Sequence, residues 1–100
     1  MVRSLTGGYV YILCNRRNGA LYIGVTADLA RRVWEHREGI GSEHCAEHGI
    51  TRLVHVEQFE TIVEAIAREK ALKKWKRDWK IRLIEKINPD WRDLWFDLNK

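Results

Sequence analysis

Two tyrosines near the start of the chain are placed where they could act on a phosphate. Tyr11 lies in an apolar run, and Tyr22 follows the turn signal Asn18-Gly19 at a distance that puts both phenols on one face of a hairpin. Gly24 lies between them and the next element, and its missing side chain leaves room for a backbone or phosphate. Both tyrosines could equally be core residues with hydroxyls at the rim.

A second pair of polar residues follows in the segment that we expect to form the first helix. Arg32 and His36 are four residues apart and therefore share one helix face. A guanidinium matches phosphate oxygens, and an imidazole exchanges protons near neutral pH. The alternative is an ordinary exposed surface, since Arg31 and Arg37 lie in the same segment.

Glu69 is the most informative acidic residue, because it falls inside the apolar arc of a predicted helix. Ala65, Ile66 and Leu72 belong to that arc. A carboxylate on a buried face must be paired, protonated or bound to a metal. The sequence therefore leaves two interpretations open: a metal ligand, or an ion pair with a nearby arginine such as Arg32.

A basic segment indicates a polyanion partner. Residues 68–82 contain eight basic and two acidic residues, a net charge of +6, which exceeds the total of +4 for the whole chain. The residues expected to contact nucleic acid are Lys73, Lys74, Lys76, Arg77 and Lys80. Trp75 and Trp79 could stack on exposed bases or belong to the core, and we favour the core for at least one of them. A solvated helix face would show the same charge pattern.

Nothing in the chain indicates export or a membrane. Its first residues lack a secretory signal, no apolar run is long enough to span a bilayer, and two cysteines make no disulfide framework. We therefore expect a cytoplasmic protein. Cys14 is predicted to be a core residue. The stretch His44 to His48, with Cys45, could supply zinc ligands, but it lacks a partner motif, so a polar loop is favoured.

These residues must be positioned by a single domain, 1–100, of α/β class, an α+β sandwich built on a small antiparallel sheet. The predicted strands are Gly8–Cys14, Ala20–Val25 and Leu53–Phe59, and the predicted helices are 26–37, 61–74, 78–86 and a last one from Trp91 to Leu98. A two-residue turn at Asn18-Gly19 would pair Leu13 with Gly24 and Asn15 with Tyr22.

Taken in order, these positions resemble the GIY-YIG nuclease pattern. The quoted residues are Tyr9-Val10-Tyr11, Tyr22-Ile23-Gly24, Arg32, His36, Glu69 and Asn88. The half-motifs are about ten residues apart, and the likeness runs from Gly8 to Trp95, with the small stand-alone bacterial members most similar. The first half-motif departs from Gly-Ile-Tyr, although Gly8 lies one residue earlier.

The resemblance implies a GIY-YIG fold, in which a three-stranded antiparallel sheet is flanked by helices, and hydrolysis of DNA phosphodiesters with a divalent metal ion, Mg²⁺ or Mn²⁺. It assigns the site to Tyr11, Tyr22, Arg32, His36, Glu69 and Asn88. By this likeness Glu69 holds the metal, either tyrosine orients or deprotonates water, and Arg32 stabilises the transition state. His36 then carries a proton or a hydrogen bond, and Asn88 supports the site.

The function expected from this likeness is that of an endonuclease with low sequence specificity, directed by DNA structure in repair or recombination. The expected partner is DNA, with no membrane and no small-molecule cofactor, and the sequence does not indicate an oligomeric state. One alternative is a non-catalytic nucleic-acid-binding module with the same fold. Another is a subunit whose tryptophan-rich C-terminus docks a protein partner.

Overall fold

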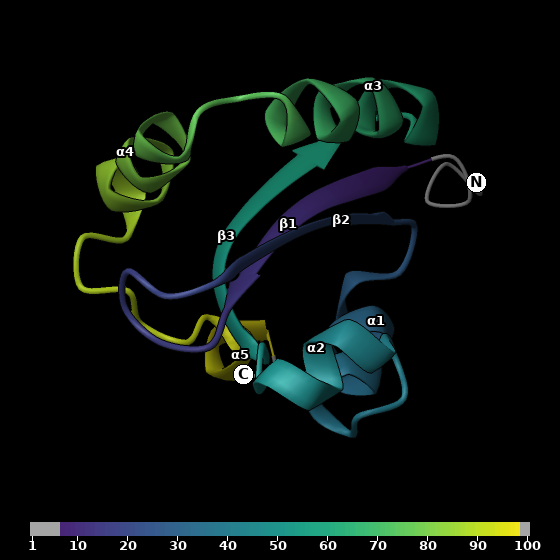
Figure 1. Ribbon diagram of the computed structural model, residues 1–100. Coiled ribbons are helices and arrows are strands. Elements are labelled where there is room, and N and C mark those ends of the chain that lie inside the picture. The colour runs from purple at the N-terminus through teal and green to yellow at the C-terminus, as the bar shows by residue number, and fades with distance from the viewer. Residues whose placement is uncertain (1–6, 99–100) are drawn as a thin grey trace.

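The computed structural model describes residues 7–98, which form a three-stranded antiparallel sheet flanked by helices (Figure 1). The strands are β1 (Gly8–Cys14), β2 (Leu21–Thr26) and β3 (Arg52–Phe59), in the order β2-β1-β3. The central strand β1 is almost entirely buried, as its apolar side chains on both faces predict. The expected fold class is confirmed, and β2 is an edge strand.

The hairpin between β1 and β2 differs from its predicted register by two residues. Tyr11 pairs with Gly24 and Leu13 with Tyr22, because the connection is longer than a two-residue turn. The side-chain oxygen of Asn15 accepts the backbone N–H of Ala20 at 2.9 Å and closes this longer loop. Because side chains alternate with a period of two, the shift leaves both tyrosines on the same face.

Helices cover both faces of the sheet (Figure 1). The bounds are α1 (Leu29–Arg37), α2 (Glu43–His48), α3 (Ile62–Lys73), α4 (Arg77–Ile87) and α5 (Trp95–Leu98). On one face, Val10 and Ile12 pack with residues of α3 and α4. On the other, Tyr11 and Leu13 pack with residues of α1, α2 and α5. Within residues 7–98, no helix has the length and apolar character that crossing a membrane requires.

Local capping explains where the longer helices begin. The Asp28 carboxylate accepts the backbone N–H of Arg31 and opens α1. Thr61 and Glu64 form a capping box at the start of α3, so that two backbone N–H groups there are satisfied reciprocally. The helix α4 ends at Ile87, with Asn88 as its C-cap directly before the single proline, because a proline disfavours helical backbone at the residue before it.

Two predictions about irregular segments were wrong. The expected polar loop contains α2, which begins at a Ser42 cap, ends at Gly49 in the left-handed conformation and buries Cys45. The expected helix from Trp91 to Leu98 is reduced to the short α5. Trp91 has a positive φ of 55°, so it cannot belong to that helix.

The segment after α4 joins the two halves of the core. Trp91 is fully buried with the residues under α3 and α4, whereas Leu94 packs on the opposite cluster. Asp93, between them, accepts the backbone N–H of Leu53 at 3.2 Å and pairs with Arg37 at 2.8 Å. The tryptophan-rich end of the chain therefore packs on its own domain.

Candidate active site

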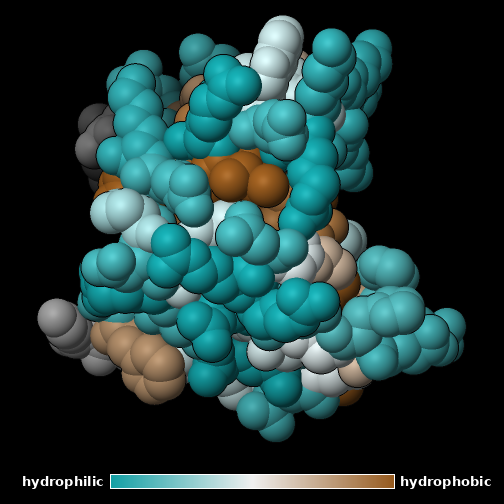
Figure 2. All heavy atoms as spheres, turned by 60° about the vertical axis from the view of Figure 1, so that its left-hand side comes forward, coloured by the Kyte–Doolittle hydropathy of each residue, from teal (hydrophilic) through white to brown (hydrophobic). Residues whose placement is uncertain are grey.

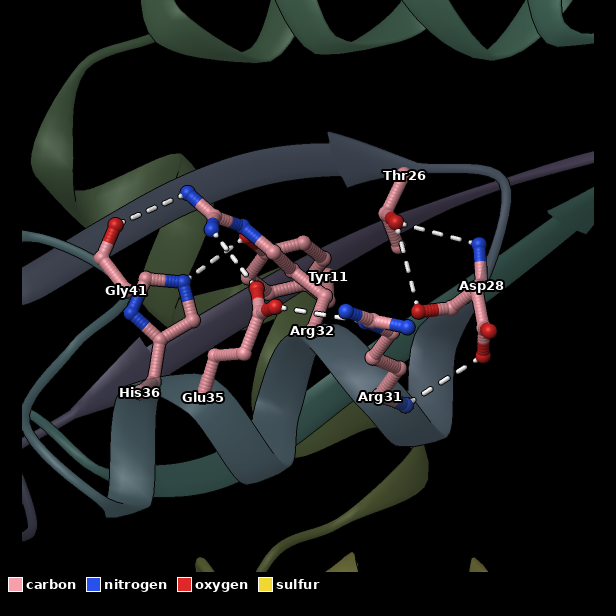
Figure 3. A network of polar contacts seen from close by, with 8 residues as sticks. All are labelled: Tyr11, Thr26, Asp28, Arg31, Arg32, Glu35, His36 and Gly41. Atoms are coloured by element: carbon pink, nitrogen blue, oxygen red, sulfur yellow. Dashed lines mark hydrogen bonds and ion pairs between the residues drawn. The ribbon is translucent and has the colours of Figure 1, made fainter.

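Four of the predicted site residues meet in one cluster, carried by β1, β2 and α1. The ring centroids of Tyr11 and Tyr22 are 6.4 Å apart, and His36 lies 5.7 Å and 5.3 Å from them. Arg32 comes from the preceding turn of α1 and lies beside Tyr11 and His36 (Figure 3). Side chains up to 25 residues apart in the sequence thus converge on one face of the sheet.

Gly24 decides where the hydroxyl of Tyr11 lies. A Cβ atom at Gly24 would stand 2.3 Å from both the Cζ atom and the hydroxyl oxygen of Tyr11, so only glycine allows this packing. The Tyr11 ring therefore crosses the edge strand β2. Tyr11 is 1% exposed, and burial raises its pKa to about 12, although the neighbouring Arg32 guanidinium opposes the shift.

His36 is the hydrogen-bond partner of Tyr11. Its Nε2 atom lies 3.0 Å from the Tyr11 hydroxyl (Figure 3). Burial lowers the pKa of His36, and the nearby Arg32 cation lowers it further, so the imidazole is neutral at pH 7. Its Nδ1 atom is buried and has no hydrogen-bond partner among residues 7–98. The hydrogen-bonding capacity of this nitrogen is therefore unsatisfied within the described residues.

Arg32 is held by groups that the sequence analysis missed. It donates to the Glu35 carboxylate at 3.0 Å and to the carbonyl oxygen of Gly41 at 3.0 Å (Figure 3). Glu35 lies three residues after Arg32, and this spacing in a helix was the available signal. Gly41 must approach His36 closely, since a Cβ there would stand 2.9 Å from Nδ1. The loop after α1 thus fixes both catalytic candidates on that helix.

Glu69 lies on α3, which packs against β1 and β2 from the opposite face of the sheet. Its side chain is 12% exposed, as the apolar arc predicts, although Ile66 of that arc is 37% exposed. The suggested pair with Arg32 is not formed, because Glu69 pairs with Lys73 one turn later. The partner of this carboxylate is thus a lysine that is itself half exposed.

The side-chain hydrogen bonds of Asn88 are not made with the tyrosine cluster. Its side-chain amide donates to the carbonyl oxygens of Val54 and Arg92, and its oxygen accepts the backbone N–H of Arg92 at 3.0 Å. These bonds use both N–H donors of the amide, and the bond to Val54 joins the end of α4 to β3. Asn88 is 5% exposed, so its observed contacts are those of a residue that fixes the chain after α4.

The predicted nucleic-acid-binding residues divide into two groups. Lys74 and Lys76 are exposed, and Lys80 is half-buried. The other two are engaged inside the domain: Lys73 with Glu69, and Arg77 with the hairpin loop, where it donates to the carbonyl oxygens of Asn18 and Gly19 at 2.6 and 2.7 Å. The free cations of this segment are therefore fewer than its composition suggests.

A second polar cluster was not predicted. Glu57 on β3 lies 2.8 Å from the Nε2 atom of His55 and accepts two hydrogen bonds from Arg68 on α3. The hydrogen bond with His55 lowers the pKa of Glu57 to about 2, and Arg68 contributes although burial opposes it. Arg68 also lies 5.1 Å from the centre of the Trp75 ring. This cluster ties α3 to the sheet.

Both cysteines are core residues. Cys14 and Cys45 are fully buried as free thiols, and burial raises the pKa of each. The rings of His44 and His48 on α2 lie next to each other, with centroids 4.7 Å apart and an interplanar angle of 53°. In the described part of the chain, 7–98, no three Asp, Glu, His or Cys side chains converge in a way that could hold a metal ion.

Comparisons with known proteins show which family this chain resembles. The family model of the GIY-YIG catalytic domain matches residues 7–82. A UPF0213 protein of Haloquadratum walsbyi is 40% identical over 78 residues, covering 77% of this chain and 85% of the relative. A UPF0213 protein of Clostridium perfringens is 40% identical over 76 residues, covering 76% of this chain and 81% of the relative.

A solved structure supports the same assignment. The solution NMR structure of a UPF0213 protein from Bacillus halodurans superposes with a TM-score of 0.55 at 31% sequence identity, covering 87% of this chain and 92% of that one. Both tyrosine-bearing strands of the three-stranded antiparallel sheet lie inside the matched family model. The chain therefore belongs to the GIY-YIG catalytic domain family, a family of nucleases.

Proposed function

We propose that this protein is a metal-dependent endonuclease that hydrolyses DNA phosphodiester bonds with low sequence specificity. The observation that carries the proposal is the convergence of Tyr11, Tyr22, Arg32 and His36 from three separate elements. Such a cluster combines a guanidinium for a phosphate with groups that hold protons. A purely structural core would not need these groups together.

The residues present fit a magnesium ion better than a zinc ion. Mg²⁺ keeps several waters and is bound through one or two carboxylates together with substrate phosphates. Glu69 offers one shielded carboxylate, and its partner Lys73 has a side chain that is 54% exposed and free to swing away. Such an ion would neutralise charge on the phosphate and the leaving oxygen.

The two tyrosines differ in what they can do. Tyr11 is buried with its pKa raised to about 12, so it stays protonated and positions His36 through their hydrogen bond. Tyr22 is only partly buried, and its hydroxyl has no hydrogen-bond partner among residues 7–98. We therefore assign contact with the attacking water to Tyr22 and a positioning role to Tyr11.

Arg32 is suited to bind the phosphate itself. Its side chain is 32% exposed, and the contacts with Glu35 and Gly41 use only part of its N–H donors. Glu69 and the tyrosines approach the sheet from opposite faces. We therefore infer that the DNA backbone crosses the edge of β2, where a phosphate can reach side chains from both faces.

Low sequence specificity follows from the kind of contacts that are available. Lys74 and Lys76 are exposed cations, and contacts of this kind bind phosphates without reading bases. A substrate distinguished by its shape, such as branched, nicked or damaged DNA, is therefore proposed, in repair or recombination. Cytoplasmic location is part of the same proposal.

Cleavage of labelled linear, nicked and branched DNA with Mg²⁺ or Mn²⁺ tests the proposal. Glu69→Gln and Arg32→Ala are expected to lower cleavage by about 100-fold or more while DNA binding persists. The matched controls are Glu60→Gln, an exposed glutamate before α3, and Arg31→Ala, whose side chain is 74% exposed on the same helix as Arg32. Both controls should retain cleavage.

The same experiment separates the alternative of a non-catalytic nucleic-acid-binding module. Binding without metal-dependent cleavage in the wild-type protein would favour that module. Equal residual cleavage in the wild type, Glu69→Gln and Arg32→Ala would indicate a contaminating nuclease and refute the proposal. A loss in the controls as large as in the site variants would also contradict it.

A further inference from the structure

An open groove on α4 lies outside the cluster of Tyr11, Tyr22, Arg32 and His36. Its volume is about 410 Å³, and its lining consists of Trp75, Trp79, Arg82, Leu83 and Lys86. The four lining residues of α4 follow at spacings of three, four and seven from the first, so they share one helix face. Figure 2 turns the α4 side forward and shows a recessed apolar patch surrounded by hydrophilic side chains.

The two indoles of the groove differ in burial. Trp75 is half-buried, packs against the core and lies under the Arg68 guanidinium at 5.1 Å. Trp79 is 49% exposed and meets Trp75 edge to face, with centroids 5.9 Å apart and an interplanar angle of 82°. Trp75 is thus held in place by the core, and Trp79 presents a flat aromatic face to the groove.

The charges at the groove favour an anionic occupant. Arg82 and Lys86 are both exposed, and neither forms an ion pair with a side chain in residues 7–98. No acidic residue lines the groove within this described range. An aromatic face flanked by cations is suited to a ligand that combines flat apolar rings with negative charge at regular intervals.

We propose that this groove binds unpaired nucleobases of a single-stranded nucleic acid segment, with the adjacent phosphates on Arg82 and Lys86. Bases in a duplex are stacked on each other and offer no free face to Trp79, whereas unpaired bases do. The inference rests on the proposed function, because it assigns a single-stranded region to the substrate of that nuclease. It explains why an exposed tryptophan lies among free cations.

Binding of a dye-labelled oligodeoxythymidylate of about 12 nucleotides, measured by fluorescence anisotropy, tests the proposal. The measurement uses the Glu69→Gln protein in EDTA, so that cleavage does not enter. Trp79→Ala is expected to weaken binding by about 5- to 150-fold, and Trp79→Phe by less, because a phenyl ring still stacks. Trp34→Ala is the matched control, since Trp34 on α1 is 46% exposed, and it should change binding by less than about 2-fold.

Three further measurements test whether the effect is specific to this groove. Lys86 is exposed on α4, so Lys86→Glu should leave the core intact. This substitution should also weaken oligodeoxythymidylate binding. A blunt-ended DNA duplex of two fully complementary strands should bind the Trp79→Ala variant nearly as well as the parent. Replacing both Arg82 and Lys86 by alanine should reduce the slope of log affinity against log salt by about 1.4, from about 0.7 for each phosphate contact.

The proposal is overturned if Trp79→Ala and Trp34→Ala have equal effects, or if Trp79→Ala weakens duplex and single-strand binding alike. It is also overturned if Trp79→Ala or Lys86→Glu converts a dimer into a monomer in light scattering with no change in oligonucleotide affinity, since the groove would then join two copies. If the wild-type protein never cleaves DNA but its oligonucleotide binding depends on Trp79, the proposed nuclease function is refuted and the proposed groove is not. Cleavage without dependence of binding on Trp79 would refute the groove alone.

Discussion

The substitution Gly24→Ala directly tests the packing of Tyr11 against β2. The added Cβ would stand 2.3 Å from the Cζ atom and the hydroxyl oxygen of Tyr11. This is about 1.2 Å closer than the ~3.5 Å at which carbon atoms attract each other. The ring has to move by a similar distance, and its 3.0 Å hydrogen bond with His36 cannot survive such a displacement.

The free-energy cost follows from these two effects. Forcing a methyl group into a packed core costs about 1–3 kcal/mol, and losing the hydrogen bond costs about 0.5–1.5 kcal/mol. We therefore expect Gly24→Ala to lower the free energy of unfolding by about 2–4 kcal/mol in urea titrations. DNA cleavage should fall as well, because Tyr11 no longer positions His36.

A second background makes this prediction refutable. Tyr11→Leu removes the atoms that the new methyl group would meet, so Gly24→Ala should cost less than about 1 kcal/mol in that background. If Gly24→Ala lowers stability equally in both backgrounds, the clash with the ring is not the cause. Close packing against Tyr11 would then not be the reason for a glycine in this strand.

Three further predictions concern contacts away from that cluster. Because its pKa falls from 4.5 unfolded to about 2 folded, Glu57 should contribute about 2–3 kcal/mol of stability above pH 4.5, lost as the pH falls towards 2. The stability difference between wild type and Glu57→Gln should shrink over this range; a constant difference contradicts the ion-pair assignment. Arg77→Ala should cost about 1 kcal/mol in thermal unfolding by releasing the hairpin loop, and the Lys76→Ala control less than about 0.5 kcal/mol. Cys14 and Cys45 should react with a thiol reagent only after unfolding in urea, and rapid reaction of either native thiol would show that it is accessible.

Patterns that depend on neighbouring residues were sufficient to predict the three strands and the three longer helices. The start of α3 at its Thr61 cap and the end of α4 before Pro89 depend on local signals, and both agree with the predicted ranges 61–74 and 78–86 to within about one residue. The hairpin register was wrong because the side chain of Asn15 closes a longer loop than the Asn18-Gly19 signal suggests. Tyr22 was still correctly placed on the same face as Tyr11, since a shift of two residues leaves each side chain on its original face of the sheet.

Contacts between distant segments could not be predicted in the same way. The short α2 forms because Cys45 is buried and Gly49 ends the helix, and neither fact has a strong periodic signal. The positive φ of Trp91 is likewise a result of its burial between elements rather than of its neighbours. The choice of Lys73 rather than Arg32 as the partner of Glu69 depends on which face of the sheet each helix covers.

The segment that links the two halves of the core has a consequence for biosynthesis. Trp91 completes one apolar layer and Leu94 packs on the other, so neither layer is closed until this stretch is available. The chain is synthesised at about 5–20 residues per second, and the ribosome encloses its newest part. The strands therefore emerge before the residues that complete their packing. Folding of this domain on the ribosome should therefore finish only after residues up to Leu98 have left the exit tunnel, which makes the nascent chain a natural client for chaperones.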